Sequence, residues 1–228
     1  MTEKALSFHP LMGELLDENN TVSIDLSSSN FYLRKIDLMD LHAFDDFVFQ
    51  NLNNNKKIKY AIGGYGENRA IYARSQVFNM RDSVYRNIHL GIDIWSFSGT
   101  PIYCPLEGKI HSFQDNIGFG NYGPTIILEH QLKGNTIYSL YGHLTRWDLK
   151  TWEIDTVLEK GQLIGRLGTP DENGAWPPHL HFQLVNCLGN YKGDYPGVCG
   201  EIEKLQYLKN CPNPNNWIGC SLLESINN

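Results

Sequence analysis

The stretch Ala175-Trp176-Pro177-Pro178-His179-Leu180-His181-Phe182-Gln183-Leu184 contains two histidines separated by a single residue. Polar and apolar residues alternate from His179 onward, which predicts a strand over residues 180–185. Alternate side chains of a strand leave the same face, so the two imidazoles should lie about 6 to 7 Å apart along the backbone. Such a pair can share one site. A short motif of this kind also occurs by chance, so its weight depends on the other segments.

Two earlier segments carry residues of matching chemistry. His89-Leu90-Gly91-Ile92-Asp93 supplies an imidazole and a carboxylate on a second predicted strand, and Tyr141-Gly142-His143-Leu144 supplies another imidazole at the end of a third. Histidine and aspartate are residue types that bind zinc in proteins. We therefore interpret the three segments as contributors to one metal centre.

The spacing of His89 and Asp93 sets a condition on this interpretation. Residues four apart on a straight strand lie about 13 Å apart, whereas the ligand atoms around one zinc ion lie about 3 Å from each other. The backbone must therefore bend between them. Gly91 lies midway, where a bulge or kink costs least, so the sequence predicts an irregularity over residues 89–91.

The candidate ligands indicate an open rather than a closed metal site. A structural zinc is held by four protein ligands, usually including cysteine, whereas a catalytic zinc has three protein ligands and one position for water or substrate. Two histidines and one aspartate without a nearby cysteine fit the open type. Two of the four candidate histidines would then remain to move protons or to stabilise an oxyanion.

The pattern of the remaining chain predicts a mainly β fold. Glycine-rich turns separate short strand-like segments, and few helical segments lie between them, which argues against a parallel sheet. We expect a mainly antiparallel, two-layer, sandwich-like β domain. Its predicted strands cover residues 58–62, 69–73, 90–95, 101–104, 108–114, 125–130, 136–143, 162–167 and 180–185.

The ends of the chain differ from this β-rich part. Apolar residues recur at helical spacing over residues 40–52, with Asp40 as a candidate N-cap, and a second helix is predicted near residues 201–208. The glycines of residues 63–66 lack the Lys-Ser/Thr and the following helix of a phosphate loop. We predict a small α/β N-terminal extension (1–57), a central domain (58–190) and a C-terminal extension (191–228).

Composition excludes several classes of partner. The 228 residues carry a net charge of −6, and the absence of a long basic cluster argues against nucleic acid. Apolar runs are too short to span a membrane, and the N-terminus lacks a secretory pattern. We expect a cytoplasmic protein, with a periplasmic or secreted location as the alternative.

The five cysteines are expected to be mostly reduced and buried, with a Cys211/Cys220 disulfide or a second metal site as alternatives.

In this order on glycine-separated strands, the His-x-x-x-Asp, Tyr-x-His-Leu and His-x-His segments resemble the lysostaphin-type (LytM-like) zinc metallopeptidases, which are endopeptidases of bacterial cell-wall peptides. The resemblance covers about residues 60–185 and includes Gly99-Thr100-Pro101. It implies the fold of that family. It also implies Zn²⁺ bound by His89, Asp93 and His181, with His143 and His179 as catalytic histidines outside the ligand set.

Residues 174–181 and 193–198 are more similar to a branch of this family that is fused to aminotransferase- and kinase-like domains. The resemblance implies a zinc metalloendopeptidase acting on peptidoglycan peptides or related small peptides. Asn121 and Tyr122 are candidate substrate contacts because they lie on the glycine-rich loop of residues 118–123. A module that keeps the fold but only binds a peptide or another partner is the alternative. Cupin barrels also contain His-x-His pairs, but here no glutamate follows the pair closely and no later histidine exists.

Overall fold

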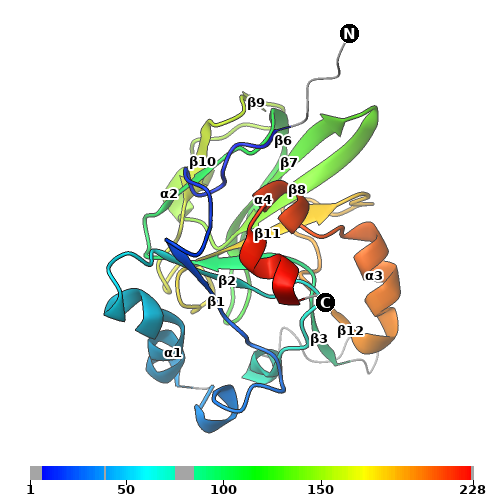
Figure 1. Ribbon diagram of the computed structural model, residues 1–228. Coiled ribbons are helices and arrows are strands. Elements are labelled where there is room, and N and C mark those ends of the chain that lie inside the picture. The colour runs from blue at the N-terminus through cyan, green and yellow to red at the C-terminus, as the bar shows by residue number, and fades with distance from the viewer. Residues whose placement is uncertain (1–6, 39, 75–84, 227–228) are drawn as a thin grey trace.

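The computed structural model describes residues 7–38, 40–74 and 85–226, and it shows the mainly β, largely antiparallel fold that the sequence predicts. The main sheet has eight strands in the order β1-β2-β4-β11-β8-β7-β6-β9 (Figure 1). Among the described residues, β1–β2 is the one parallel pair of this sheet. Its strands are β1 (Thr21–Ser23), β2 (Tyr60–Gly63), β4 (Ile92–Trp95), β11 (His179–Val185), β8 (Asn135–Gly142), β7 (Gly123–Leu132), β6 (Gly108–Asn116) and β9 (Val157–Leu158).

Two small sheets and several short helices surround the main sheet. β5 (Pro101–Tyr103) pairs with β10 (Leu163–Arg166), and β3 (Arg86–His89) pairs with β12 (Val198–Gly200). The α-helices are α1 (Leu41–Asn54), α2 (Arg146–Leu149), α3 (Lys204–Asn210) and α4 (Asn215–Ile218). The 3-10 helices are η1 (Leu33–Lys35), η2 (Ala70–Arg74), η4 (Glu201–Glu203) and η5 (Ser221–Ile226).

The predicted N-terminal helix is confirmed, including its cap. Helix α1 begins after Asp40, whose carboxylate accepts hydrogen bonds from the backbone N–H groups of His42 and Ala43. This side chain satisfies donors that the first turn of a helix leaves without partners. The buried side chains Phe44 and Val48 pack in a cluster with residues of β2 and β4, so α1 covers one part of the main sheet.

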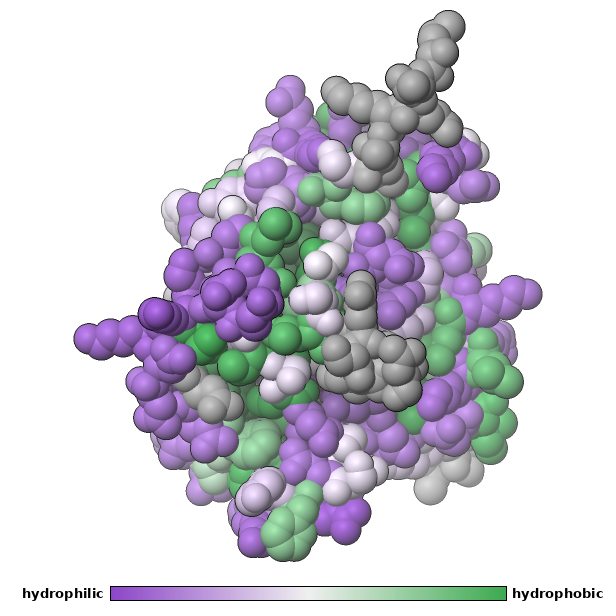
Figure 2. Space-filling view, in the orientation of Figure 1, coloured by the Kyte–Doolittle hydropathy of each residue, from purple (hydrophilic) through white to green (hydrophobic). Residues whose placement is uncertain are grey.

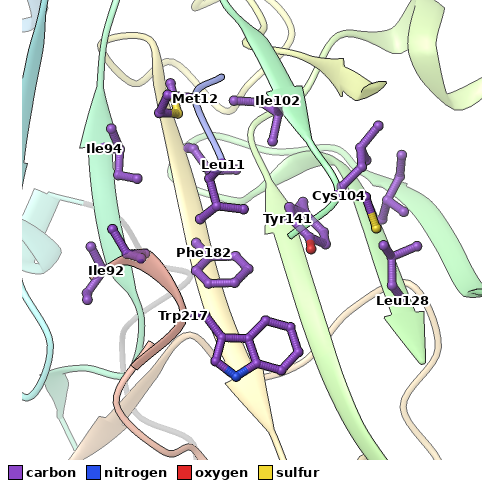
Figure 3. Close-up of a cluster of buried hydrophobic side chains, with 14 of the residues drawn as sticks. Leu11, Met12, Ile92, Ile94, Ile102, Cys104, Leu128, Tyr141, Phe182 and Trp217 are labelled. Atoms are coloured by element: carbon purple, nitrogen blue, oxygen red, sulfur yellow. The ribbon is translucent and has the colours of Figure 1, made fainter. Parts of the chain in front are cut away.

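The alternation of β11 separates the two faces of the main sheet. Leu180, Phe182 and Leu184 enter the largest apolar cluster, which also contains Ile102 of β5 and Ile164 of β10. The small β5–β10 sheet therefore forms a second layer over this face. Figure 3 shows Phe182 between the strands of this core, with the Trp217 ring beside it; the two ring centroids lie 6.4 Å apart.

The opposite face of the same strands carries the polar candidates. His181 lies directly opposite Asp93 on β4 and opposite Gly142 on β8, next to His143. Since neighbouring strands of a sheet lie about 5 Å apart, this register brings the predicted residues together. Seen in the orientation of Figure 1, where α4 lies in front of the sheet, the molecular surface is mostly hydrophilic, with apolar residues gathered near the centre of the view (Figure 2).

The predicted irregularity between His89 and Asp93 is confirmed. β3 ends at His89 and pairs with β12, whereas β4 begins at Ile92 and belongs to the main sheet. The chain thus changes sheets over two residues, Leu90 and Gly91. A Cβ atom on Gly91 would lie 2.6 Å from His181 Cε1 and 2.8 Å from the Phe182 carbonyl oxygen. Glycine is therefore required for the close approach of His181 at this bend.

We expect Gly91→Ala to destabilise the protein by about 1–3 kcal/mol, the usual cost of overpacking, and to weaken metal binding because the new methyl group displaces His181. Gly108→Ala is the matched control, since its Cβ would lie 2.6 Å from His130 Nδ1 and 2.9 Å from the Glu129 carbonyl oxygen, on another strand pair. Thermal unfolding and zinc titration of both variants test this. Equal zinc binding by the two variants would contradict it.

One predicted strand is wrong. Residues 69–73 were expected to form a strand after the glycine-rich turn of residues 63–66, but Ala70–Arg74 form the 3-10 helix η2. Arg69 makes only an isolated bridge, to Ser27. Ile71 and Tyr72 then turn into the apolar cluster of α1, so tertiary packing overrides the local preference for a strand.

The C-terminal helix was expected near residues 201–208, and the structure has η4 followed by α3 there. The proposed division at residues 57 and 190 stays a prediction. β1, from the predicted N-terminal extension, pairs with β2. Among the described residues, none of the helices combines the length and apolar character that a membrane span requires.

Candidate metal centre

Three of the predicted residues converge on one buried point. His89 ends β3, Asp93 lies on β4 and His181 lies on β11, and one ligand atom from each lies within 4.8 Å of the others. Asp93 Oδ1 is 3.3 Å from His89 Nε2 and 3.1 Å from His181 Nδ1. The two nitrogens are 2.9 Å apart. This separation is that of ligand atoms around a single ion of zinc size.

Hydrogen bonds on the outer side of each imidazole orient these nitrogens. His89 Nδ1 lies 2.9 Å from the Gly64 carbonyl oxygen, which can only accept, so His89 carries its proton on Nδ1. His181 Nε2 lies 2.9 Å from Gln183 Oε1. The Gln183 amide donates to the Pro196 carbonyl, which leaves Oε1 facing His181 as an acceptor. Outer-sphere partners of this kind fix the tautomer of metal-binding histidines.

The consequence is that the inner nitrogens of His89 and His181 both carry lone pairs, and they point toward each other and toward Asp93 Oδ1. Three lone-pair donors at this spacing repel one another unless a cation lies between them. The donor set of two imidazoles and one carboxylate is one that zinc uses in open sites. The residues of this centre therefore fit a zinc ion.

The electrostatics keep His89 and Asp93 in the protonation states that metals require. Burial lowers the pKa of His89 to about 3, and the Arg69 guanidinium adds to this effect. Burial alone would raise the pKa of Asp93, but His89 and Arg69 beside it outweigh burial, and the pKa lies well below its usual value. A neutral imidazole and an ionised carboxylate, the forms favoured here for His89 and Asp93, are those that coordinate a metal.

The two remaining predicted histidines stand beside this centre. His143 directly follows β8, and its Nδ1 lies 2.9 Å from the Asn173 carbonyl oxygen; His179 Nδ1 lies 2.7 Å from the Pro177 carbonyl oxygen. The two rings lie 4.1 Å apart between centroids. Each donates from Nδ1, so each Nε2 carries a lone pair. Burial is the main cause that lowers the pKa of both histidines.

His143 adopts a left-handed backbone conformation, with φ of 65°. This conformation is uncommon for residues other than glycine, although histidine is among those enriched there. The His143 N–H donates to the Tyr122 carbonyl and its own carbonyl accepts from the Gly168 N–H. The surrounding backbone thus holds the imidazole in place next to His179.

All five predicted residues line one cavity of about 390 Å³. The candidate substrate contacts Asn121 and Tyr122 line it as well. The structure brings the five together as expected, and the separate roles of ligand and catalyst stay predictions. The cavity is also lined by residues that the sequence did not indicate, among them Arg69, Tyr72, Asp194 and Tyr195.

Gln183 is one neighbour of the centre that the sequence pattern could have indicated. It lies two residues after His181 on the alternating strand and therefore on the same face of the sheet. Arg69, which donates to Asp93 Oδ2, had no such signal because its segment was interpreted as a regular strand.

The family model for peptidase family M23 matches residues 87–193. These residues match the M23 family, and curated relatives support the same family. We call them the M23 segment below. It includes all five site residues, in agreement with the resemblance to lysostaphin-type peptidases. The finer resemblance to proteins fused to aminotransferase- and kinase-like domains stays a prediction.

Two curated relatives and one solved structure illustrate the similarity. Peptidoglycan DD-endopeptidase ShyB of Vibrio cholerae is 25% identical over 177 residues, which are 75% of this chain and 38% of ShyB. Lysostaphin of Staphylococcus staphylolyticus is 31% identical over 110 residues, 48% of this chain and 21% of lysostaphin. The catalytic domain of lysostaphin from Staphylococcus simulans aligns with 23% identity and a TM-score of 0.40, over 69% of this chain and 96% of that domain. The chain therefore spans well under half the length of these curated relatives.

Proposed function

We propose that this chain is a zinc metalloendopeptidase whose metal ligands are His89, Asp93 and His181. The observation that supports this most directly is the convergence of His89 Nε2, His181 Nδ1 and Asp93 Oδ1 within a buried centre. The match of the M23 segment to a peptidase family supports the same reaction class. Three protein ligands leave a further position, as catalytic zinc sites require.

A zinc ion held there would polarise the scissile carbonyl and lower the pKa of a bound water. The chain's own contribution to the proton transfers comes from His143 and His179, whose Nε2 atoms carry lone pairs beside the centre. One of the two would accept the proton of the attacking water at Nε2 and later deliver it to the leaving amine. The other would take up a proton from solvent at Nε2 before it donates a hydrogen bond to the developing oxyanion. Their Nδ1 bonds to backbone carbonyls hold both rings in the orientation that this requires.

The substrates we propose are peptides of bacterial peptidoglycan or related small peptides. The name of the relative ShyB, a peptidoglycan DD-endopeptidase, supports this class. The cavity offers aromatic walls from Tyr122 and Trp176 together with polar groups, which suits a peptide backbone flanked by small side chains. A cell-wall substrate favours the periplasmic or secreted alternative over the cytoplasmic location expected from the sequence.

Metal analysis followed by a digestion assay tests this function. The purified chain is expected to bind one zinc per molecule and to cleave peptides from a panel of peptidoglycan stem and cross-bridge fragments, with chelator removing and added zinc restoring the activity. Mass spectrometry of the products identifies the bond. A chain that binds zinc and peptides but cleaves none of the panel would support the non-catalytic binding module instead. A folded chain that binds no zinc would refute the proposal.

A further inference from the structure

A short segment outside the M23 segment lies directly behind two of the three proposed ligands. Residues 64–69 connect β2 to η2. The Gly64 carbonyl accepts a hydrogen bond from His89 Nδ1, and Arg69 Nη1 donates to Asp93 Oδ2. The outer atoms of His89 and Asp93 therefore both contact residues that precede position 87, where the M23 match begins.

Backbone hydrogen bonds hold this segment firmly against β3. The Gly66 N–H donates to the His89 carbonyl at 2.8 Å, and the His89 N–H donates to the Glu67 carbonyl at 2.9 Å. The Arg69 N–H donates to the Asn87 carbonyl at 2.8 Å. These three bonds to Asn87 and His89, which are alternate residues of β3, give the segment a defined register. Arg69 therefore reaches Asp93 from a fixed position.

The Arg69 guanidinium is buried, with 3% of the side chain exposed. Its Nε donates to Glu67 Oε2 at 2.6 Å, and its Nη1 also contacts the Tyr72 hydroxyl at 3.2 Å. Glu67 is anchored in turn, because its Oε1 accepts from the Leu26 N–H. A buried charge is costly unless it is paired and hydrogen-bonded. The Glu67–Arg69–Asp93 chain pairs this charge with two carboxylates through Nε and Nη1, while the buried Nη2 makes no hydrogen bond to the described residues.

The backbone at residue 64 is shaped to admit this guanidinium. Gly64 has φ of 107°, a conformation that side chains rarely adopt, and a Cβ atom there would lie 1.9 Å from Arg69 Nη2. Glycine at position 64 therefore allows the backbone of the turn to pack directly against the Arg69 guanidinium and the His89 ring.

We propose that Arg69 is a positioning residue of the metal site, which fixes Asp93 so that a single carboxylate oxygen, Oδ1, faces the metal. The inference rests on the zinc site proposed above. Arg69 occupies Oδ2, and Oδ1 is left within 3.1 and 3.3 Å of the two inner nitrogens. Without this donor the carboxylate can rotate or present both oxygens. The preorganised geometry, and with it the affinity for the ion, would be lost.

Arg69→Lys tests the proposal, because a lysine ammonium is a point charge and cannot bridge Glu67 and Asp93 as a planar fork does. Zinc affinity, measured by competition with a chromophoric chelator, is expected to fall about 10- to 100-fold, as for loss of other outer-sphere partners. The visible spectrum of the Co²⁺-substituted chain should change with the coordination of Asp93. Arg166→Lys is the matched control, since Arg166 pairs with Asp148 at 2.8 Å in another part of the fold. It should leave zinc affinity and the Co²⁺ spectrum unchanged.

A purely structural role of Arg69 predicts a different result. The melting temperature of the zinc-free chain would fall, while the zinc affinity of the folded fraction and the Co²⁺ spectrum would match the parental chain. That outcome overturns the inference and leaves the proposed function intact. If Arg69→Lys fails to fold, Glu67→Gln keeps Arg69 and weakens only its anchor, so it should lower zinc affinity less, in the same direction. Unchanged affinity in Glu67→Gln would then refute the inference. A parental chain without zinc would instead refute the proposed function itself.

Discussion

Replacing His181 with alanine is expected to abolish zinc retention and, with it, peptide hydrolysis. His181 occupies the centre of the arrangement, because its Nδ1 lies 2.9 Å from His89 Nε2 and 3.1 Å from Asp93 Oδ1. Its removal leaves two ligands, and the loss of affinity should exceed the roughly 100-fold upper end seen when only an outer-sphere partner is removed. Equilibrium dialysis against zinc followed by metal analysis measures this directly.

Folding must be checked separately for this variant, since His181 is buried and hydrogen-bonded to Gln183. The zinc-free parental chain and zinc-free His181→Ala should both unfold cooperatively, and only the parental chain should gain stability when zinc is added, because only binding to the native state stabilises it. His42→Ala, on the exposed first turn of α1, is the control that should behave like the parental chain. Full zinc retention by His181→Ala would refute the proposed ligand set.

The strands around the site were predictable because their residues alternate. Leu180, Phe182 and Leu184 enter one core while His179 and His181 leave the other face, and this period of two is visible in the sequence. The bend before Asp93 was predictable for a different reason: a metal ion cannot bridge residues four apart on a straight strand, and a glycine stands between them. The first argument depends on neighbouring residues only, and the second adds the interpretation that His89 and Asp93 bind one metal ion.

The parts that were not predicted depend on distant partners. β3 exists because it pairs with β12, more than a hundred positions later in the chain, and the two-residue strand β9 adds to the edge of β6. Neither strand has a periodic pattern long enough to indicate it. Arg69 is a further example, because its role is apparent only from its contact with Asp93, which lies 24 positions later on β4. A lone arginine in a short apolar segment carries no signal of such a partner.

The prediction that separates catalysis from metal binding is His143→Ala. His143 is expected to be dispensable for zinc, because its Nδ1 bonds to the Asn173 carbonyl and its ring centroid lies 6.5 Å from that of His181. Hydrolysis should fall about 10²- to 10⁴-fold, the usual contribution of a positioned general acid or base. Zinc content and peptide cleavage measured on the same preparation give the test.

Alanine also strains the left-handed backbone at this position, where φ is 65°, so a second variant is needed to separate strain from chemistry. Asparagine tolerates this conformation better than alanine but cannot exchange a proton near neutral pH. His143→Asn should therefore retain zinc and the parental melting temperature more closely than His143→Ala, yet lose activity to the same extent. Activity that recovers in the asparagine variant would show that backbone geometry, rather than proton transfer, accounts for the loss. Zinc lost in both variants would place His143 among the ligands and require the assignment of His89, Asp93 and His181 to be revised.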